Sequence, residues 1–148
     1  RKDSVRKKLN TIQAEFEGKT LLIVDDSIIR GNTSRRIVEM VREAGAKHVY
    51  FASSSPPVVH PNVYGIDMPA KHEYVAYNRT VDEIAEAIGA DWLIYQHLDD
   101  LVECCLGAGG EHLVNFDCSC FDGKYVAGRI DADYLTALEE KRKDSAKA

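Results

Sequence analysis

The sequence lacks features that would assign it to several large classes of protein. It has no run of about 18 apolar residues, so we expect no membrane-spanning helix. No apolar stretch follows its basic first ten residues, so no signal peptide is predicted. Its formal net charge is −5, which argues against the basic surface of a nucleic-acid-binding domain. We therefore expect neither membranes nor nucleic acid as partners.

An initiator Met is also absent, as expected of part of a longer chain. The 148 residues suffice for one domain with a sizeable core, and we see no second domain boundary.

Cysteine is absent from the first 103 residues, and the four cysteines are Cys104, Cys105, Cys118 and Cys120. Without a sign of secretion, reduced thiols are expected rather than disulfides. One residue separates Cys118 from Cys120, whereas zinc and iron–sulfur motifs leave two or more between their cysteines. We therefore predict buried, apolar thiols and no metal at these positions.

The apolar pattern of the first half predicts an α/β domain. A continuous apolar run at 20–24 predicts a strand that is covered on both faces. An apolar stripe at 33–44 predicts a helix that ends at Gly45, and the β-rich residues 48–53 predict the next strand. A strand, a helix and a second strand form a βαβ unit, so we expect a parallel pair with a right-handed crossover.

The second half continues this alternation. Residues 53–62 are rich in Pro and Ser and predict a loop, and residues 80–90 predict a helix with a Thr80–Glu83 capping box and a stop at Gly89. The remaining predicted elements are a strand at 91–96, a helix at 98–106, a flexible link at 106–112, a short strand at 124–130 and a terminal helix at 131–146. The expected organisation is a basic arm at 1–19, an α/β core at 20–106 and a C-terminal extension at 107–148.

Two adjacent acids, Asp25 and Asp26, end the first predicted strand. Ligands of open parallel sheets bind at the carboxyl ends of the strands. Adjacent carboxylates can share a divalent cation or accept hydrogen bonds from two vicinal hydroxyls. Gly31 and the Asn-Thr-Ser at 32–34 offer amides and hydroxyls to an anion at the positive end of the next helix. This combination suits a phosphorylated sugar.

The same residues allow a second interpretation, in which the acid pair is a solvated turn, Asn32 or Thr33 caps the helix, and nothing binds. The segment has neither the Gly-x-x-x-x-Gly-Lys-Ser/Thr of a Walker loop nor the three glycines of a dinucleotide fingerprint. Response-regulator domains also bind magnesium through acid pairs at strand ends, but they lack the Gly-Asn-Thr-Ser that follows here.

The segment VDDSIIRGNTS (residues 24–34) resembles the phosphoribosylpyrophosphate motif of the type I phosphoribosyltransferases. Its form is similar to that of the glutamine phosphoribosylpyrophosphate amidotransferases. Five other segments resemble the same family in the same order, so that the resemblance covers nearly the whole chain: RKDSVRKKLN, EAGAKHVYFASSSPP, NVYGIDMP, IYQHLDDL and FDGKYVAG.

The resemblance implies the C-terminal part of a parallel-sheet, Rossmann-like type I phosphoribosyltransferase domain, truncated and with a helical tail. The intact enzymes are cytoplasmic homo-oligomers that purine nucleotides (AMP, GMP) inhibit. They form phosphoribosylamine, pyrophosphate and glutamate from phosphoribosylpyrophosphate, glutamine and water, the first committed step of purine (IMP) synthesis. The glutaminase domain and the pyrophosphate loop are missing here, so this chain alone is expected to be inactive. The alternative is a non-catalytic module that binds phosphoribosylpyrophosphate or a nucleotide.

The resemblance also implies roles for the motif. Asp25 and Asp26 would bind the ribose hydroxyls and Mg²⁺, and the loop would wrap the terminal phosphate. The candidate substrate-binding residues are Asp25, Asp26, Ser27, Ile28, Ile29, Arg30, Gly31, Asn32, Thr33 and Ser34. No catalytic nucleophile is expected in this chain, because ammonia attacks directly. Arg30 has two interpretations, a phosphate ligand or a solvent-facing partner of an acid.

Other positions carry secondary expectations. Some family members bind an iron–sulfur cluster through a Cys-x-x-Cys near the C-terminus, but Asp117 stands where the partner of Cys120 would lie, so no cluster is expected. His60 is expected to be an exposed loop residue. Residues 62–69 either line a nucleotide site or pack in the core. The basic arm either borders the active site or is solvated. A truncated sheet should expose a strand edge and an apolar face, which favours self-association.

Overall fold

The computed structural model describes residues 13–109 and 112–145 of the chain. Its elements follow one another in the order α2 (Gln13–Phe16), β1 (Thr20–Asp25), α3 (Asn32–Glu43), β2 (His48–Ser53), the 3₁₀ helix η1 (Lys71–Glu73), α4 (Val81–Ile88), β3 (Trp92–Tyr95), α5 (Leu98–Gly109), α6 (Ser119–Asp122) and α7 (Ala132–Ser145). The basic residues Arg1, Lys2, Arg6, Lys7 and Lys8 of the expected arm lie outside the described residues.

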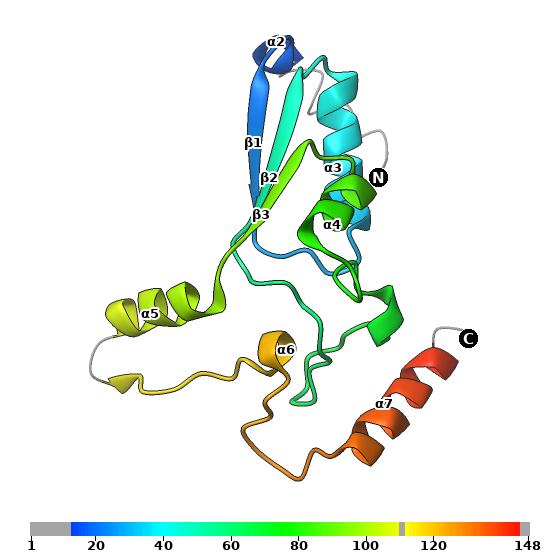
Figure 1. Ribbon diagram of the computed structural model, residues 1–148, viewed down its shortest axis with the longest axis vertical. Coiled ribbons are helices and arrows are strands. Elements are labelled where there is room, and N and C mark those ends of the chain that lie inside the picture. The colour runs from blue at the N-terminus through cyan, green and yellow to red at the C-terminus, as the bar shows by residue number, and fades with distance from the viewer. Residues whose placement is uncertain (1–12, 110–111, 146–148) are drawn as a thin grey trace.

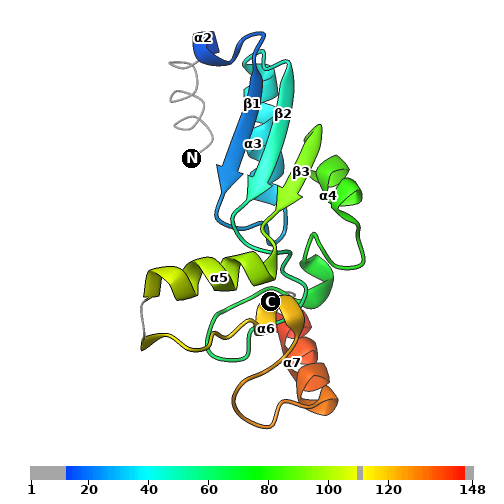
Figure 2. The same ribbon diagram turned by 60° about the vertical axis from the view of Figure 1, so that its left-hand side comes forward.

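Three parallel strands form one sheet in the order β1–β2–β3. Asp25 at the end of β1 pairs with Ser53, which in turn pairs with Tyr95, so the carboxyl ends of all three strands meet at one edge. Helices α3 and α4 lie side by side on one face of this sheet (Figures 1 and 2). The predicted α/β fold with parallel strands is therefore confirmed.

The main core lies between the sheet and these two helices. Its fully buried members come from both layers and include Val38, Val49, Phe51, Ile84 and Ile88. Helix α4 begins and ends as its sequence predicts, because the Thr80 hydroxyl accepts a hydrogen bond from the Glu83 amide and Gly89 ends the helix with φ at 80°.

The other face of the sheet is uncovered in the described part of the chain. Four large apolar side chains on it are exposed: Leu22 by 61%, Val24 by 64%, Trp92 by 49% and Ile94 by 44%. The register places Leu22 in one row with Tyr50 and Trp92, and Val24 in one row with Ala52 and Ile94. The prediction that the first strand is covered on both faces is wrong for this structure, because α3 and α4 pack on the same side.

A second, smaller cluster lies beyond the carboxyl edge. Val58, Met68 and Tyr74 are buried there, and Phe121 of α6 packs against them. The segment 124–130 also lies in this region, but it forms no strand. It is held by tyrosine hydroxyls instead, because Tyr125 donates to the Pro61 carbonyl and the Ala127 amide donates to Tyr64. The predicted short strand is therefore wrong.

The remaining differences concern α5 and the cysteines. Helix α5 continues to Gly109, so the expected boundary at 106/107 falls inside a helix. All four cysteines are free thiols, but Cys104 is exposed and the other three are half-buried. The expectation of buried thiols is therefore wrong: Cys104 and Cys105 lie on α5, which projects away from the core (Figure 1), and Cys120 is only partly buried against the second cluster. No helix within 13–109 or 112–145 is both long and apolar enough to cross a membrane.

The uncovered sheet face generates the first prediction. We expect the 148-residue chain on its own to self-associate through this face, because a contiguous apolar patch of this kind favours association. Placing charges on both outer strands of this face with Val24→Lys and Ile94→Lys should shift the chain to monomer in sedimentation velocity. Val114→Lys is the matched control, since Val114 is 84% exposed but lies outside the sheet. A wild-type chain that sediments as a monomer at all concentrations would contradict the prediction.

Candidate functional site

The acid pair lies at the carboxyl edge of the sheet, where β1 ends. Asp25 is half-buried and Asp26 is exposed. Each carboxylate accepts a hydrogen bond from the next backbone amide: Asp26 N–H donates to Asp25 Oδ1 at 3.0 Å, and Ser27 N–H donates to Asp26 Oδ1 at 2.8 Å. These amides offset part of the repulsion between the two charges and leave the second oxygen of each carboxylate for another partner.

The loop after the acid pair is fixed to the segment between η1 and α4. The Val75 amide donates a hydrogen bond of 2.8 Å to the Ile29 carbonyl, and the Ile28 side chain is buried in the main core. Gly31 has φ at 74°, and a Cβ there would lie 3.0 Å from Val75 Cγ2 and 3.2 Å from Ile88 Cγ2. Glycine is required at position 31 both by the backbone conformation and by this close packing.

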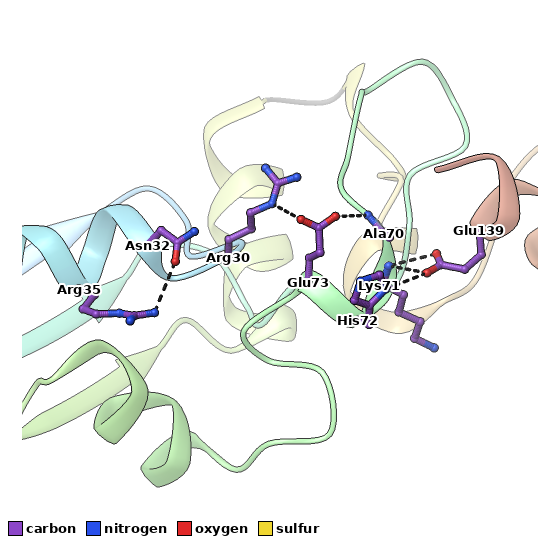
Figure 3. Close-up of polar contacts among 8 residues, drawn as sticks. All are labelled: Arg30, Asn32, Arg35, Ala70, Lys71, His72, Glu73 and Glu139. Carbon is purple, nitrogen blue, oxygen red and sulfur yellow. Dashed lines mark hydrogen bonds and ion pairs between the residues drawn. The ribbon is translucent and has the colours of Figure 1, made fainter. Parts of the chain in front are cut away.

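Helix α3 begins directly after this turn, with Gly31 as its N-cap and no side-chain cap. The interpretation in which Asn32 or Thr33 caps the helix is therefore wrong, and Asn32 Oδ1 instead accepts a hydrogen bond from Arg35 (Figure 3). The first amides of a helix have no partner within the helix. The amides at 32–34 are thus available to an anion at the positive end of α3, with the exposed Thr33 beside them and Ser34 buried.

Arg30 points from the loop to an acid that the sequence analysis did not identify. Its Nε donates a hydrogen bond of 2.8 Å to Oε2 of Glu73 in η1 (Figure 3). The guanidinium of Arg30 lowers the pKa of Glu73 below its ordinary value. Of the two interpretations of Arg30, pairing with an acid is found, and no described residue occupies its terminal nitrogens. Glu73 lies 43 positions away in the sequence, so no local pattern points to it.

The acid pair matches the way proteins bind Mg²⁺. Within the described ranges, no group of three or more His, Cys, Asp or Glu side chains forms a metal cage. Mg²⁺ is usually held by one or two carboxylates together with substrate phosphates and water. The donor set of Asp25 and Asp26 therefore fits a magnesium ion that arrives with a phosphorylated ligand. Asp117 stands at the position considered for an iron–sulfur ligand, and its carboxylate accepts a hydrogen bond from the Ser119 amide.

His60 packs against Gly123, and within the segment 62–69 Asn62 and Met68 are buried whereas residues 64–67 are exposed. The His60 ring lies against Gly123, and burial, followed by the nearby Lys71, lowers its pKa. His60 is half-buried, so the expectation of an exposed residue is wrong. Asn62 is buried and its Oδ1 accepts hydrogen bonds from the amides of Tyr64 and Ile66, which closes a turn.

No family model matches the chain. Curated relatives do match, and proteins named amidophosphoribosyltransferase from three organisms illustrate the similarity. The chain is 53% identical over 148 residues to the Pseudomonas aeruginosa protein and covers 100% of itself and 29% of that relative. The Escherichia coli protein gives the same identity and coverage. The Saccharomyces cerevisiae protein is 47% identical over 146 residues, which cover 99% of this chain and 28% of the relative.

Solved structures match as well. One, described as the allosteric regulatory enzyme of purine biosynthesis, is 41% identical with a TM-score of 0.69 and matches 86% of this chain and 28% of its own. A glutamine phosphoribosylpyrophosphate amidotransferase from B. subtilis, complexed with ADP and GMP, gives 40% identity and the same TM-score and coverage. The chain thus spans less than a third of the length of the proteins it matches.

The close packing of Gly31 generates the second prediction. Gly31→Ala should lower the free energy of unfolding by about 2–4 kcal/mol, because it combines backbone strain with overpacking against Val75 and Ile88. Gly18→Ala is the matched control: its φ is 70°, but nothing lies within 4 Å of its Cβ, so only about 1 kcal/mol of backbone strain is expected. Urea denaturation measures both. Equal losses in the two variants would show that the packing contributes nothing.

Proposed function

The chain is homologous over its whole length to a segment of the amidophosphoribosyltransferases, and we propose that it forms the phosphoribosylpyrophosphate-binding part of such an enzyme. In this proposal it is the C-terminal part of the phosphoribosyltransferase domain. The α/β core ends with α5, a C-terminal extension follows, and the glutaminase domain lies elsewhere in the intact enzyme. The homology supports this proposal because it extends from the first residue to the last.

One observation carries the assignment of the site. The loop that starts at the acid pair and ends at the uncapped start of α3 is held in place by Val75, so that carboxylates and free helix amides lie at opposite ends of one short, fixed loop. A ribose with vicinal hydroxyls and a terminal phosphate needs acceptors at one end and donors at the other. Phosphoribosylpyrophosphate has this chemistry.

The proposed reaction replaces the pyrophosphate on the anomeric carbon by ammonia, which gives phosphoribosylamine. Asp25 and Asp26 accept hydrogen bonds from the ribose hydroxyls and are placed to hold Mg²⁺. When bound, Mg²⁺ neutralises the negative charge that grows on the leaving pyrophosphate. The backbone amides of the loop and of residues 32–34 hold the terminal phosphate, which fixes the sugar for attack. The chain supplies orientation and charge and no nucleophile of its own.

The remaining parts of the proposal concern the intact enzyme. The B. subtilis relative is complexed with ADP and GMP, which supports the binding of purine nucleotides to the intact enzyme, and we propose that they inhibit it. A homo-oligomer in the cytoplasm is the proposed setting of the enzyme. The rival function is a non-catalytic module that binds phosphoribosylpyrophosphate or a nucleotide. The intact protein, which is the product of the longest reading frame that contains this chain, separates the two functions, because the enzyme requires a glutaminase sequence with a leading cysteine upstream.

The acid pair generates the third prediction. In the intact protein, Asp25→Asn combined with Asp26→Asn should weaken the binding of phosphoribosylpyrophosphate in the presence of Mg²⁺ by about 100-fold or more, because two charged acceptors are lost. Isothermal titration calorimetry measures this change directly.

The matched control for this variant is Asp99→Asn combined with Asp100→Asn. These two acids are adjacent as well, they are both exposed in the first turn of α5, and the net charge changes equally. Binding in the control should equal that of the wild type. Wild-type affinity in the Asp25/Asp26 variant would refute the assignment of this site.

A further inference from the structure

A chain of carboxylates links the loop to the C-terminal helix (Figure 3). Glu73 joins Arg30 of the loop to η1, and Glu139 of α7 joins η1 to the C-terminal extension. We propose that Glu73 is a positioning residue for substrate binding: it orients the Arg30 guanidinium toward the phosphates of the ligand, and Glu139 steadies the turn that carries Glu73. This inference deepens the proposed function and rests on it.

Glu73 uses its two oxygens for two different tasks. Oε2 accepts the hydrogen bond from Arg30 Nε at 2.8 Å, while Oε1 accepts one from the Ala70 amide at 3.1 Å. The Glu73 amide in turn donates to the Ala70 carbonyl at 2.9 Å. The backbone of η1 therefore holds the carboxylate in place independently of its contact with the arginine. A carboxylate held in this way determines where the guanidinium lies.

The part of Arg30 that Glu73 leaves free is suited to an anion. A guanidinium carries five N–H donors in a planar fork, and Glu73 contacts only the Nε edge. The two terminal nitrogens, with four N–H groups, have no acceptor among the described residues. Arg30 lies between the acid pair and the start of α3, so these donors belong to the same loop as the free helix amides. Paired nitrogens of this kind bind phosphate oxygens in a bidentate manner.

The exposure of the pair points to orientation rather than to stability. The side chains of Arg30 and Glu73 are 49% and 28% exposed. Ion pairs this open to solvent contribute little to the free energy of folding. An unrestrained arginine, by contrast, must give up rotamer freedom when it binds a ligand. By restricting Arg30 beforehand, Glu73 lowers that cost, and its effect appears in substrate binding.

Glu139 supports the arrangement from the opposite side of η1. Both of its oxygens accept a hydrogen bond from the Lys71 amide at 3.0 Å, and His72 Nδ1 lies 3.7 Å away. A single 3₁₀ turn of three residues has little stability of its own, so this contact from α7 fixes its first residue. Arg142 in the next turn of α7 donates to the Asn62 carbonyl at 2.9 Å and holds the helix in the same place.

Steady-state kinetics of the intact protein with ammonia as the nitrogen donor tests the proposal. Glu73→Gln should raise KM for phosphoribosylpyrophosphate by about five- to tenfold and change kcat by less than about twofold, because glutamine has one acceptor oxygen for two donors. Arg30→Ala should raise KM at least as much. The double variant should be no worse than Arg30→Ala alone, since Glu73 acts through Arg30. Glu139→Gln should raise KM by about two- to threefold.

Glu83→Gln is the matched control. Glu83 accepts a hydrogen bond from the Thr80 amide in the capping box of α4, as Glu73 does from the Ala70 amide in η1, but it contacts no residue of the loop. Its KM should equal that of the wild type even where its melting temperature falls. Thermal denaturation of every variant separates stability from binding.

Several results would overturn the proposal. An unchanged KM in Glu73→Gln, or additive effects of Glu73→Gln and Arg30→Ala, would assign Glu73 a purely structural role. If Glu73→Gln does not fold, Arg30→Lys decides, since it keeps the charge but loses the fork. A fivefold rise in the KM of Arg30→Lys for phosphoribosylpyrophosphate supports the proposal, and a wild-type KM in this variant refutes it. If the wild-type protein does not bind phosphoribosylpyrophosphate in calorimetry, the proposed function itself is refuted. Failure of the proposed function is thereby distinguished from failure of the role proposed for Glu73.

Discussion

The packing of Gly31 against Val75 and Ile88 is the constraint on which the candidate site depends. It allows the chain to reverse between β1 and α3 within a few residues, and it brings the Ile29 carbonyl to the Val75 amide. The same contact sets the first residue of α3 and therefore the direction in which its free amides point. The segment from η1 to α4 thus acts as the support of the loop, although it is more than 40 residues away in the sequence.

Strand pairing and local amides explain why two like charges stand side by side at the end of β1. Parallel pairing with β2 fixes the backbone of Asp25 opposite Ser53, so the acids cannot move apart by shifting the strand. Local amides satisfy one oxygen of each, and the remaining repulsion favours a cation or a pair of hydroxyls between them.

The sequence predicted those features that depend on local patterns. Strand β2 and the Thr80 capping box follow from β-propensity and helix-capping rules, and both are found as predicted. The failures depend on contacts between distant residues. The open sheet face results from both helices packing on the same side. The segment 124–130 is held by tyrosine hydroxyls and has no strand partner. Glu73 is distant from Arg30 in the sequence and contacts it only in the folded chain. The family resemblance located the motif but not the acid that orients its arginine.

The open sheet face and the candidate site meet at the end of β1. Along β1, Leu21, Ile23 and Asp25 alternate with the exposed Leu22 and Val24, so Asp25 lies on the side of the helices. The exposed Asp26 follows at the edge of the uncovered face. The relatives are more than three times as long as this chain, and the apolar face that is open here runs along β1 up to Val24, next to the acid pair. A segment that packs against this face would therefore lie close to the acid pair, so that covering the sheet and enclosing the acid pair are one packing problem.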